Sequence, residues 1–206
     1  MKIKIIKKSG NDLEFTAENI SIPLANALRR IMISEVPTLS VDWIDIHNNT
    51  SVLFDEMISH RIGLIPIKFN PDKFNFIDDC KCEGKGCTLC QAVFSVTKKG
   101  PCIVYSGDMK PANKEAIFTD PKFPIVELLE NQEIKLDAIA RLGIGQNHSK
   151  NQAAIAAYEY DGDGKALKFK FKIESVSGLK PDYIVEKAAH ILELKAAEFK
   201  KEVNKI

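Results

Sequence analysis

Apolar and polar residues alternate in three segments of the chain, a pattern typical of β-strands with one buried face. Residues 2–8 and 12–16 are separated by Ser9-Gly10-Asn11, a turn-forming junction. Residues 166–174 alternate most regularly. Their inward positions are Leu167, Phe169, Phe171 and Ile173, and their outward positions are Lys168, Lys170 and Lys172. The pattern predicts two strands at the start of the chain and a half-buried strand late in it.

Residues 21–36 follow a helical period instead. Ser21 can cap the start of this helix, Pro23 suits its first turn, and Pro37 ends it. One face carries Leu24, Ala27, Leu28, Ile31 and Glu35. Arg29 and Arg30 lie together at the other edge. They are either solvated charges or a polar clamp beside an apolar interface.

A second and longer helix is predicted from Pro181 to about Val203. Its apolar stripe consists of Val185, Ala188, Leu192, Ala196, Phe199 and Val203. Such a stripe is buried either against the chain's own sheet or against another chain, and the pattern alone leaves both possibilities open.

The middle of the chain begins a new run of strand-like segments at residues 41–47 and is interrupted by prolines. This pattern predicts a loop-rich β domain.

Composition narrows the class of protein further. The chain has 206 residues, of which 45% are hydrophobic and 28% charged, enough to form a core without disulfides. Its formal net charge of +1 is not that of a protein that binds nucleic acid by itself. The N-terminus lacks the apolar run of a secretory signal, and no segment has the length and hydropathy of a membrane span. We therefore expect an intracellular, cytoplasmic protein, in which thiols stay reduced.

Four cysteines lie within eleven residues, in CKCEGKGCTLC at residues 80–90. The spacing of Cys80, Cys82, Cys87 and Cys90 lets two close pairs fold back on one tetrahedral ion, with Gly84 and Gly86 permitting the reversal. Zinc suits four sulfurs in a closed, structural site. An iron–sulfur cluster uses the same ligands, and free thiols are the third possibility. No nucleophile–base pair or group of carboxylates points to a catalytic site in the chain.

Several stretches together resemble one known family. They are NALRRIMISEVPTLSVDWIDIHNNTSVLFDEMISHRIGLIPI at 26–67, the cysteine loop running into FSV, LGIGQNHSK at 142–150, and FKIESVSGLKPDYIVEKAAHILELKAAEF at 171–199. They are similar to the α-like assembly subunit of multisubunit DNA-dependent RNA polymerase, in its archaeal and eukaryotic forms.

The resemblance implies an α+β fold with a discontinuous architecture. Residues 1–40 and 156–206 would form a dimerisation domain, an antiparallel sheet with two helices, and residues 41–155 an inserted domain carrying the metal loop. The dimerisation helices would pack against a smaller homologous subunit. The interface positions implied are Leu24, Ala27, Leu28, Arg29, Arg30, Ile31, Val185, Leu192 and Phe199.

The resemblance also implies a role in assembly. The heterodimer would be a platform for the second-largest and largest polymerase subunits, with small zinc-binding subunits bound nearby. The large subunits would carry the nucleotidyl transfer and the DNA contacts, so no catalytic residue is expected here. Because the chain is short, with no second set of cysteines and no acidic tail, we expect an archaeal protein that lacks the additional iron–sulfur domain of some relatives.

Overall fold

The computed structural model describes residues 1–112, 114–162 and 167–205. The chain forms two compact units. Unit 1 combines the two ends of the chain, Met1–Thr38 and Ile144–Ile206, and unit 2 is Leu39–Gly143. The functional names given to the domains above, and their expected limits at residues 40 and 156, stay predictions.

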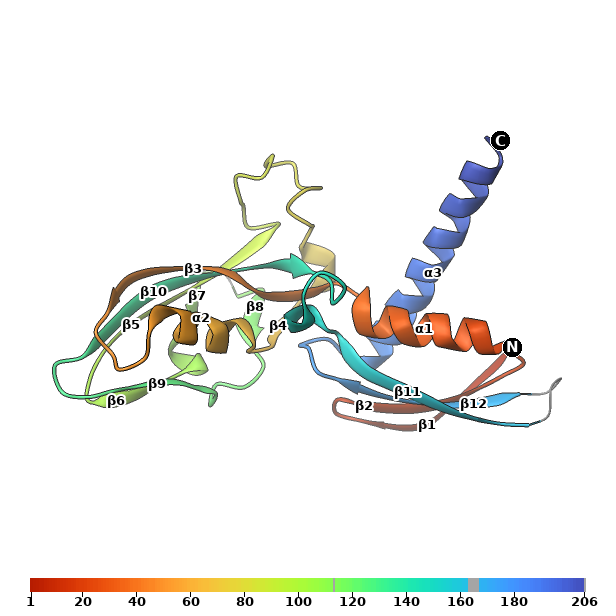
Figure 1. Cartoon of the computed structure of the whole chain (residues 1–206), viewed down its shortest axis with the longest axis horizontal. Helices are drawn as coiled ribbons and strands as arrows, with labels where there is room; N and C mark the ends of the chain where they lie inside the picture. The colour runs from red at the N-terminus through yellow and green to blue at the C-terminus, as the bar shows by residue number, and fades with distance from the viewer. Residues whose placement is uncertain (113, 163–166, 206) are drawn as a thin grey trace. The chain divides into compact units, whose positions relative to one another are not determined.

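Unit 1 contains a four-stranded antiparallel sheet in the order β1-β2-β12-β11 (Figure 1). Its strands are β1 (Lys2–Ser9), β2 (Asp12–Glu18), β11 (Ala154–Asp161) and β12 (Lys168–Ser175). The three alternating segments of the sequence are therefore strands, although residue 166 lies outside the described part of the chain. Because side chains alternate across a strand, β12 buries Phe169, Phe171 and Ile173 completely on one face.

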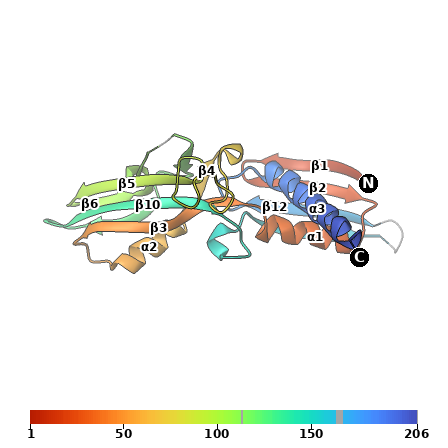
Figure 2. The same cartoon turned by 90° about the horizontal axis from the view of Figure 1, so that it is seen from above.

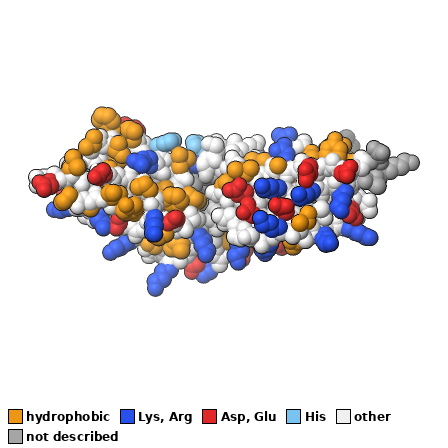
Figure 3. Space-filling model, turned by 90° about the horizontal axis from the view of Figure 1, so that it is seen from below, with side chains coloured by type: hydrophobic (Ala, Val, Ile, Leu, Met, Phe, Trp, Pro, Cys, Tyr) orange, Lys and Arg blue, Asp and Glu red, His pale blue; other side chains and the backbone are white. Residues whose placement is uncertain are grey.

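The two faces of this sheet differ in chemistry. On the buried face, Phe15 stacks on Phe171 with ring centroids 4.9 Å apart. On the opposite face, Lys170 lies 3.7 Å from a Glu14 oxygen and 3.4 Å from a Glu159 oxygen. Figure 3 shows basic and acidic side chains intermixed over this part of the surface. Cross-strand pairs of opposite charge stabilise a sheet face that stays in water.

Both long helices of unit 1 cover the apolar face of this sheet (Figures 1 and 2). The first, α1 (Ile22–Ser34), begins as predicted, because the backbone N–H of Leu24 donates to Ser21 Oγ (3.4 Å). The second, α3 (Pro181–Val203), has the predicted limits and a proline in its first turn. A short 3-10 helix, η3 (Ser149–Asn151), precedes β11.

Unit 2 contains a second four-stranded sheet, in the order β3-β10-β5-β7, and two small two-stranded sheets. The four strands are β3 (Thr38–Asn49), β10 (Glu133–Gly143), β5 (Gln91–Lys99) and β7 (Lys110–Pro111). The small sheets pair β4 (Ile67–Phe69) with β8 (Ala116–Phe118), and β6 (Cys102–Tyr105) with β9 (Pro124–Leu128). Two 3-10 helices, η1 (Pro71–Lys73) and η2 (Ser106–Asp108), lie in the connections.

One element of unit 2 was not predicted from the sequence, the helix α2 (Asp55–Gly63). It buries Ile58 and Ile62 completely, as β5 and β10 bury Phe94 and Ile134. Unit 2 thus has a core of its own, built from β-strands and one helix. None of the described helices is both long enough and apolar enough to cross a membrane.

Candidate metal centre

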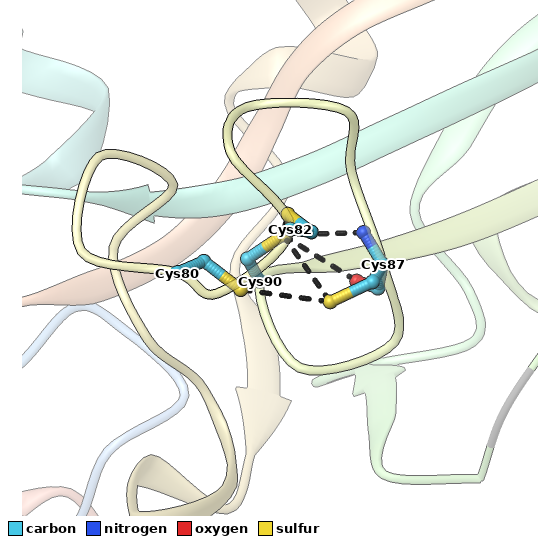
Figure 4. Close-up of side chains that lie close together, drawn as sticks. All are labelled: Cys80, Cys82, Cys87 and Cys90. Atoms are coloured by element: carbon cyan, nitrogen blue, oxygen red, sulfur yellow. Dashed lines mark hydrogen bonds between the residues drawn. The ribbon is translucent and has the colours of Figure 1, made fainter.

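The four clustered cysteines lie in the connection between β4 and β5, and tight turns position them. The backbone N–H of Glu83 donates to Cys80 O, and that of Cys90 donates to Cys87 O, each at 3.1 Å. Gly86 has a φ of 82°, in the left-handed region that favours glycine. These turns fold the two cysteine pairs back toward each other (Figure 4).

The sulfur atoms are spaced as ligands of a single ion. The Sγ–Sγ distances are 3.5 Å for Cys80–Cys87, 3.6 Å for Cys82–Cys90 and 3.8 Å for Cys87–Cys90. All four ligand atoms lie within 4.8 Å of one another. Four sulfurs at about 2.3 Å from a tetrahedral zinc ion are about 3.8 Å apart, whereas a disulfide requires about 2.05 Å. The cysteines are free thiols, and their arrangement fits a metal site.

Burial divides the ligands into two classes. Cys80 and Cys90 are buried, and Cys82 and Cys87 are half-buried. Cys90 directly precedes Gln91, the first residue of β5, so the innermost ligand is joined to a central strand of unit 2. Four protein ligands fill a tetrahedral shell and leave no position for a substrate, which is the arrangement of a structural site.

The thiols differ in how readily they lose their protons. Burial raises the pKa of the Cys90 thiol to about 12, against the hydrogen bond from the Cys87 backbone N–H. Burial also raises the pKa of Cys82, but hydrogen bonds from the Cys80 and Cys90 thiols and from the Gly86 backbone outweigh it and lower that pKa to about 7. The Cys82 backbone lowers the pKa of Cys80, yet burial and the neighbouring thiols leave it raised. Of these three thiols, Cys82 has the lowest pKa.

Backbone donors to sulfur are the part of the site that the sequence analysis did not identify. The N–H of Cys87 donates to Cys90 Sγ at 3.2 Å. Such donors stabilise the negative charge of a thiolate ligand. Gly84 and Gly86 were the signal in the sequence for these donors, because their left-handed backbone conformation changes the direction of the peptide N–H groups in the loop. Within the described ranges, the four cysteines are the only group of three or more potential ligands close enough to share an ion.

The predicted interface residues lie on α1 and α3 of unit 1. On α1, Leu24, Ala27, Leu28 and Arg29 are half-buried, Arg30 is exposed and Ile31 is buried. Arg29 also donates to Asn26 Oδ1 through Nη2 (3.0 Å). On α3, Val185 and Leu192 are half-buried and Phe199 is exposed. Their assignment to an interface stays a prediction.

Comparison with known proteins gives consistent similarities. A family profile described as RNA polymerase Rpb3/RpoA insert domain matches residues 44–160. The chain is 41% identical over 151 residues to DNA-directed RNA polymerase subunit Rpo3 of Archaeoglobus fulgidus, covering 73% of this chain and 57% of that protein. It is 40% identical over 159 residues to the Rpo3 subunit of Pyrococcus horikoshii, covering 77% and 59%. The chain thus spans just under three fifths of the length of these relatives.

Proposed function

Because the chain belongs to the Rpb3/RpoA family of RNA polymerase subunits, we propose that it is a non-catalytic subunit of DNA-directed RNA polymerase that serves assembly. In this proposal, unit 1 forms a heterodimer with a smaller homologous subunit. The heterodimer is the platform on which the second-largest and then the largest subunit are mounted for transcription. The protein would act wherever that polymerase acts, in the cytoplasm or, in a eukaryote, in the nucleus.

One observation supports the proposed heterodimer. The apolar stripe of α3 continues beyond the part that the chain's own core buries. Ile184 and Ala188 are completely buried. Four residues further along the same face, Leu192 is half-buried, and Phe199 and Val203 on the following turns are 72% and 48% exposed. Figure 1 shows this outer half of α3 extending beyond the sheet of unit 1. An apolar helical face that its own chain covers along only half of its length supports the proposal of a partner.

The first helix supports the same surface. Leu24, Ala27 and Leu28 keep part of their apolar area uncovered on α1, which contacts α3. At the junction of the two helices, Lys195 of α3 forms an ion pair with Glu35 at the end of α1. The pair is one of the contacts by which α1 and α3 meet. Arg29 and Arg30 would make charge-assisted contacts at the rim of that surface.

For the four cysteines, we propose one structural zinc ion. It would hold the connection before β5 in a fixed shape that neighbouring subunits, including small zinc-binding ones, can contact. An iron–sulfur protein with a redox role is the alternative that the same ligands would permit. Zinc is favoured because the observed sulfur spacing suits a single tetrahedral ion.

The proposal is tested by co-expression with the smaller homologous subunit, carrying the affinity tag on that subunit. We expect a one-to-one complex by light scattering and self-association of the chain when it is expressed alone. A chain that stays monomeric and does not bind the smaller subunit would contradict the heterodimer. Elemental analysis should give one zinc per chain with no visible absorption, whereas iron with sulfide would overturn the metal assignment alone.

A further inference from the structure

The four ligands of the metal centre lie on two arms of one loop, which Gly86 joins. We call residues 80–85 the first arm and residues 87–90 the second arm. Figure 4 shows the four cysteine side chains converging from these arms. The second arm leads directly into β5, whereas the first arm closes on itself through a turn in which the Lys85 N–H donates to Cys82 O at 3.1 Å. Contacts at Gly86 therefore help to set where the first arm lies relative to β5.

The side chain of Gln91, the first residue of β5, lies directly against Gly86. A β-carbon at position 86 would be 2.8 Å from Gln91 Cδ and Nε2 and closer still to Oε1, too close for either group to stay where it is. The amide of Gln91 thus occupies the space that a side chain at position 86 would need. Gln91 is half-buried, and the dispersion contacts of its amide with Gly86 stabilise this packing.

Gln91 contacts both arms of the loop. Its backbone N–H donates to Cys87 O (3.0 Å) on the second arm. Its side chain packs on Gly86, whose backbone N–H also donates to the Cys82 thiol of the first arm. Gln91 is itself fixed in the sheet, where it pairs with Arg141 of β10. A chain of contacts thus leads from the sheet of unit 2 through Gln91 and Gly86 to Cys82.

We propose that Gln91 is a positioning residue of the metal centre, whose side chain holds the first arm so that Cys82 meets the ligands of the second arm. The Sγ atoms of Cys82 and Cys90 lie 3.6 Å apart, which is close to the spacing of two ligands of one ion. Residues outside the coordination shell that orient the ligands typically change metal affinity by about 10- to 100-fold. This inference rests on the single zinc ion of the proposed function.

The test measures the rate at which the zinc-loaded, full-length chain releases zinc to an excess of a chromophoric chelator. Gln91→Ala should release zinc about 10-fold faster than the wild type or more, because the first arm loses the contact at Gly86. Gln91→Met keeps an unbranched side chain of similar length and should stay within about threefold of the wild-type rate. The matched control is Thr97→Ala, on the same face of β5 but six positions beyond Gln91, which should release zinc like the wild type.

A second measurement distinguishes positioning from a general loss of stability. A thiolate ligand reacts with N-ethylmaleimide only while it is detached from the metal. Cys82 and Cys87 are both half-buried, so their relative alkylation in the zinc-loaded chain, measured by peptide mass spectrometry, compares the opening of the two arms. Gln91→Ala should raise the ratio of Cys82 to Cys87 alkylation about fivefold or more, because the first arm opens locally.

The outcomes separate this inference from the zinc assignment. If the wild-type chain holds zinc and Gln91→Ala releases it no faster, or alkylation of the two cysteines rises in equal proportion, Gln91 does not position the first arm and the zinc site stands. If Gln91→Met releases zinc as fast as Gln91→Ala, packing on Gly86 is not the cause and the inference is wrong. If the wild-type chain holds no zinc, the metal assignment fails and this inference fails with it.

Discussion

Substituting Phe199 by Ser should weaken the heterodimer without destabilising the chain itself. Complete burial of a phenylalanine side chain stabilises by about 1.5–3 kcal/mol. Phe199 is 72% exposed in the isolated chain, so most of that free energy is still available to a partner. The substitution should therefore cost about 1–2 kcal/mol of binding free energy, roughly a 5- to 30-fold rise in Kd for the smaller subunit. Serine and phenylalanine have similar helix propensities, so α3 should stay helical.

A matched substitution on the inner part of the same stripe should behave in the opposite way. Ile184 is completely buried, and Ile184→Ala should lower the free energy of unfolding of the chain by about 2–5 kcal/mol. The assays are titration calorimetry with the smaller subunit for Kd, and urea unfolding followed by circular dichroism at low protein concentration for the chain alone.

Two results would refute this reasoning. If Phe199→Ser changed Kd by less than about twofold, the outer half of α3 would not be the surface that the partner covers. If Phe199→Ser lowered the free energy of unfolding as much as Ile184→Ala does, Phe199 would be packed within the chain rather than exposed to the partner.

Four further predictions concern the metal centre and the core of unit 1. Zinc affinity should rise about 100-fold or more per pH unit near neutrality, because the protonated thiols of Cys80 and Cys90 must both release protons on coordination. Zinc titration at several pH values checks this prediction, and an affinity that does not change with pH contradicts it. Chelation should expose backbone amides only over residues 76–91, and hydrogen exchange that spread through β5 and β10 would argue against a local role. Gly86→Ala should weaken zinc binding about 5- to 30-fold, since φ is 82° there, and an unchanged affinity would contradict that strain. Phe171→Ala should lower the free energy of unfolding by about 3–5 kcal/mol in urea, and a loss below about 1 kcal/mol would be inconsistent with its complete burial.

The sequence predicted the elements whose pattern is set locally. The limits of α3 follow from Pro181 and an unbroken apolar stripe, and β12 follows from its strict alternation of apolar residues and lysine. The cysteine cluster could be predicted because its four members lie within eleven residues, so that their meeting depends on a short loop rather than on the fold.

What the sequence did not predict depends on contacts between distant residues or on an obscured pattern. Helix α2 was missed because it is only nine residues long and has only Ile58 and Ile62 buried, which is too short a run to establish a helical period. The pairing of β5 with β10 joins Gln91 to Arg141, fifty positions away, and no local signal specifies it. The stripe of α3 gave no indication of where its covered part ends, because that point depends on the reach of the sheet beneath it.

The pairing of β2 with β12 also has a consequence for how the protein is made. Glu18, at the end of β2, pairs with Lys168, so about 150 residues must be added before β2 receives its second neighbour. At a synthesis rate of about 5–20 residues per second, that takes roughly 8–30 seconds. During this time Leu13 and Phe15 lack the neighbouring strand that carries their register partners, while the whole of unit 2 emerges and can fold. On the ribosome, therefore, the middle of this protein is finished before its beginning.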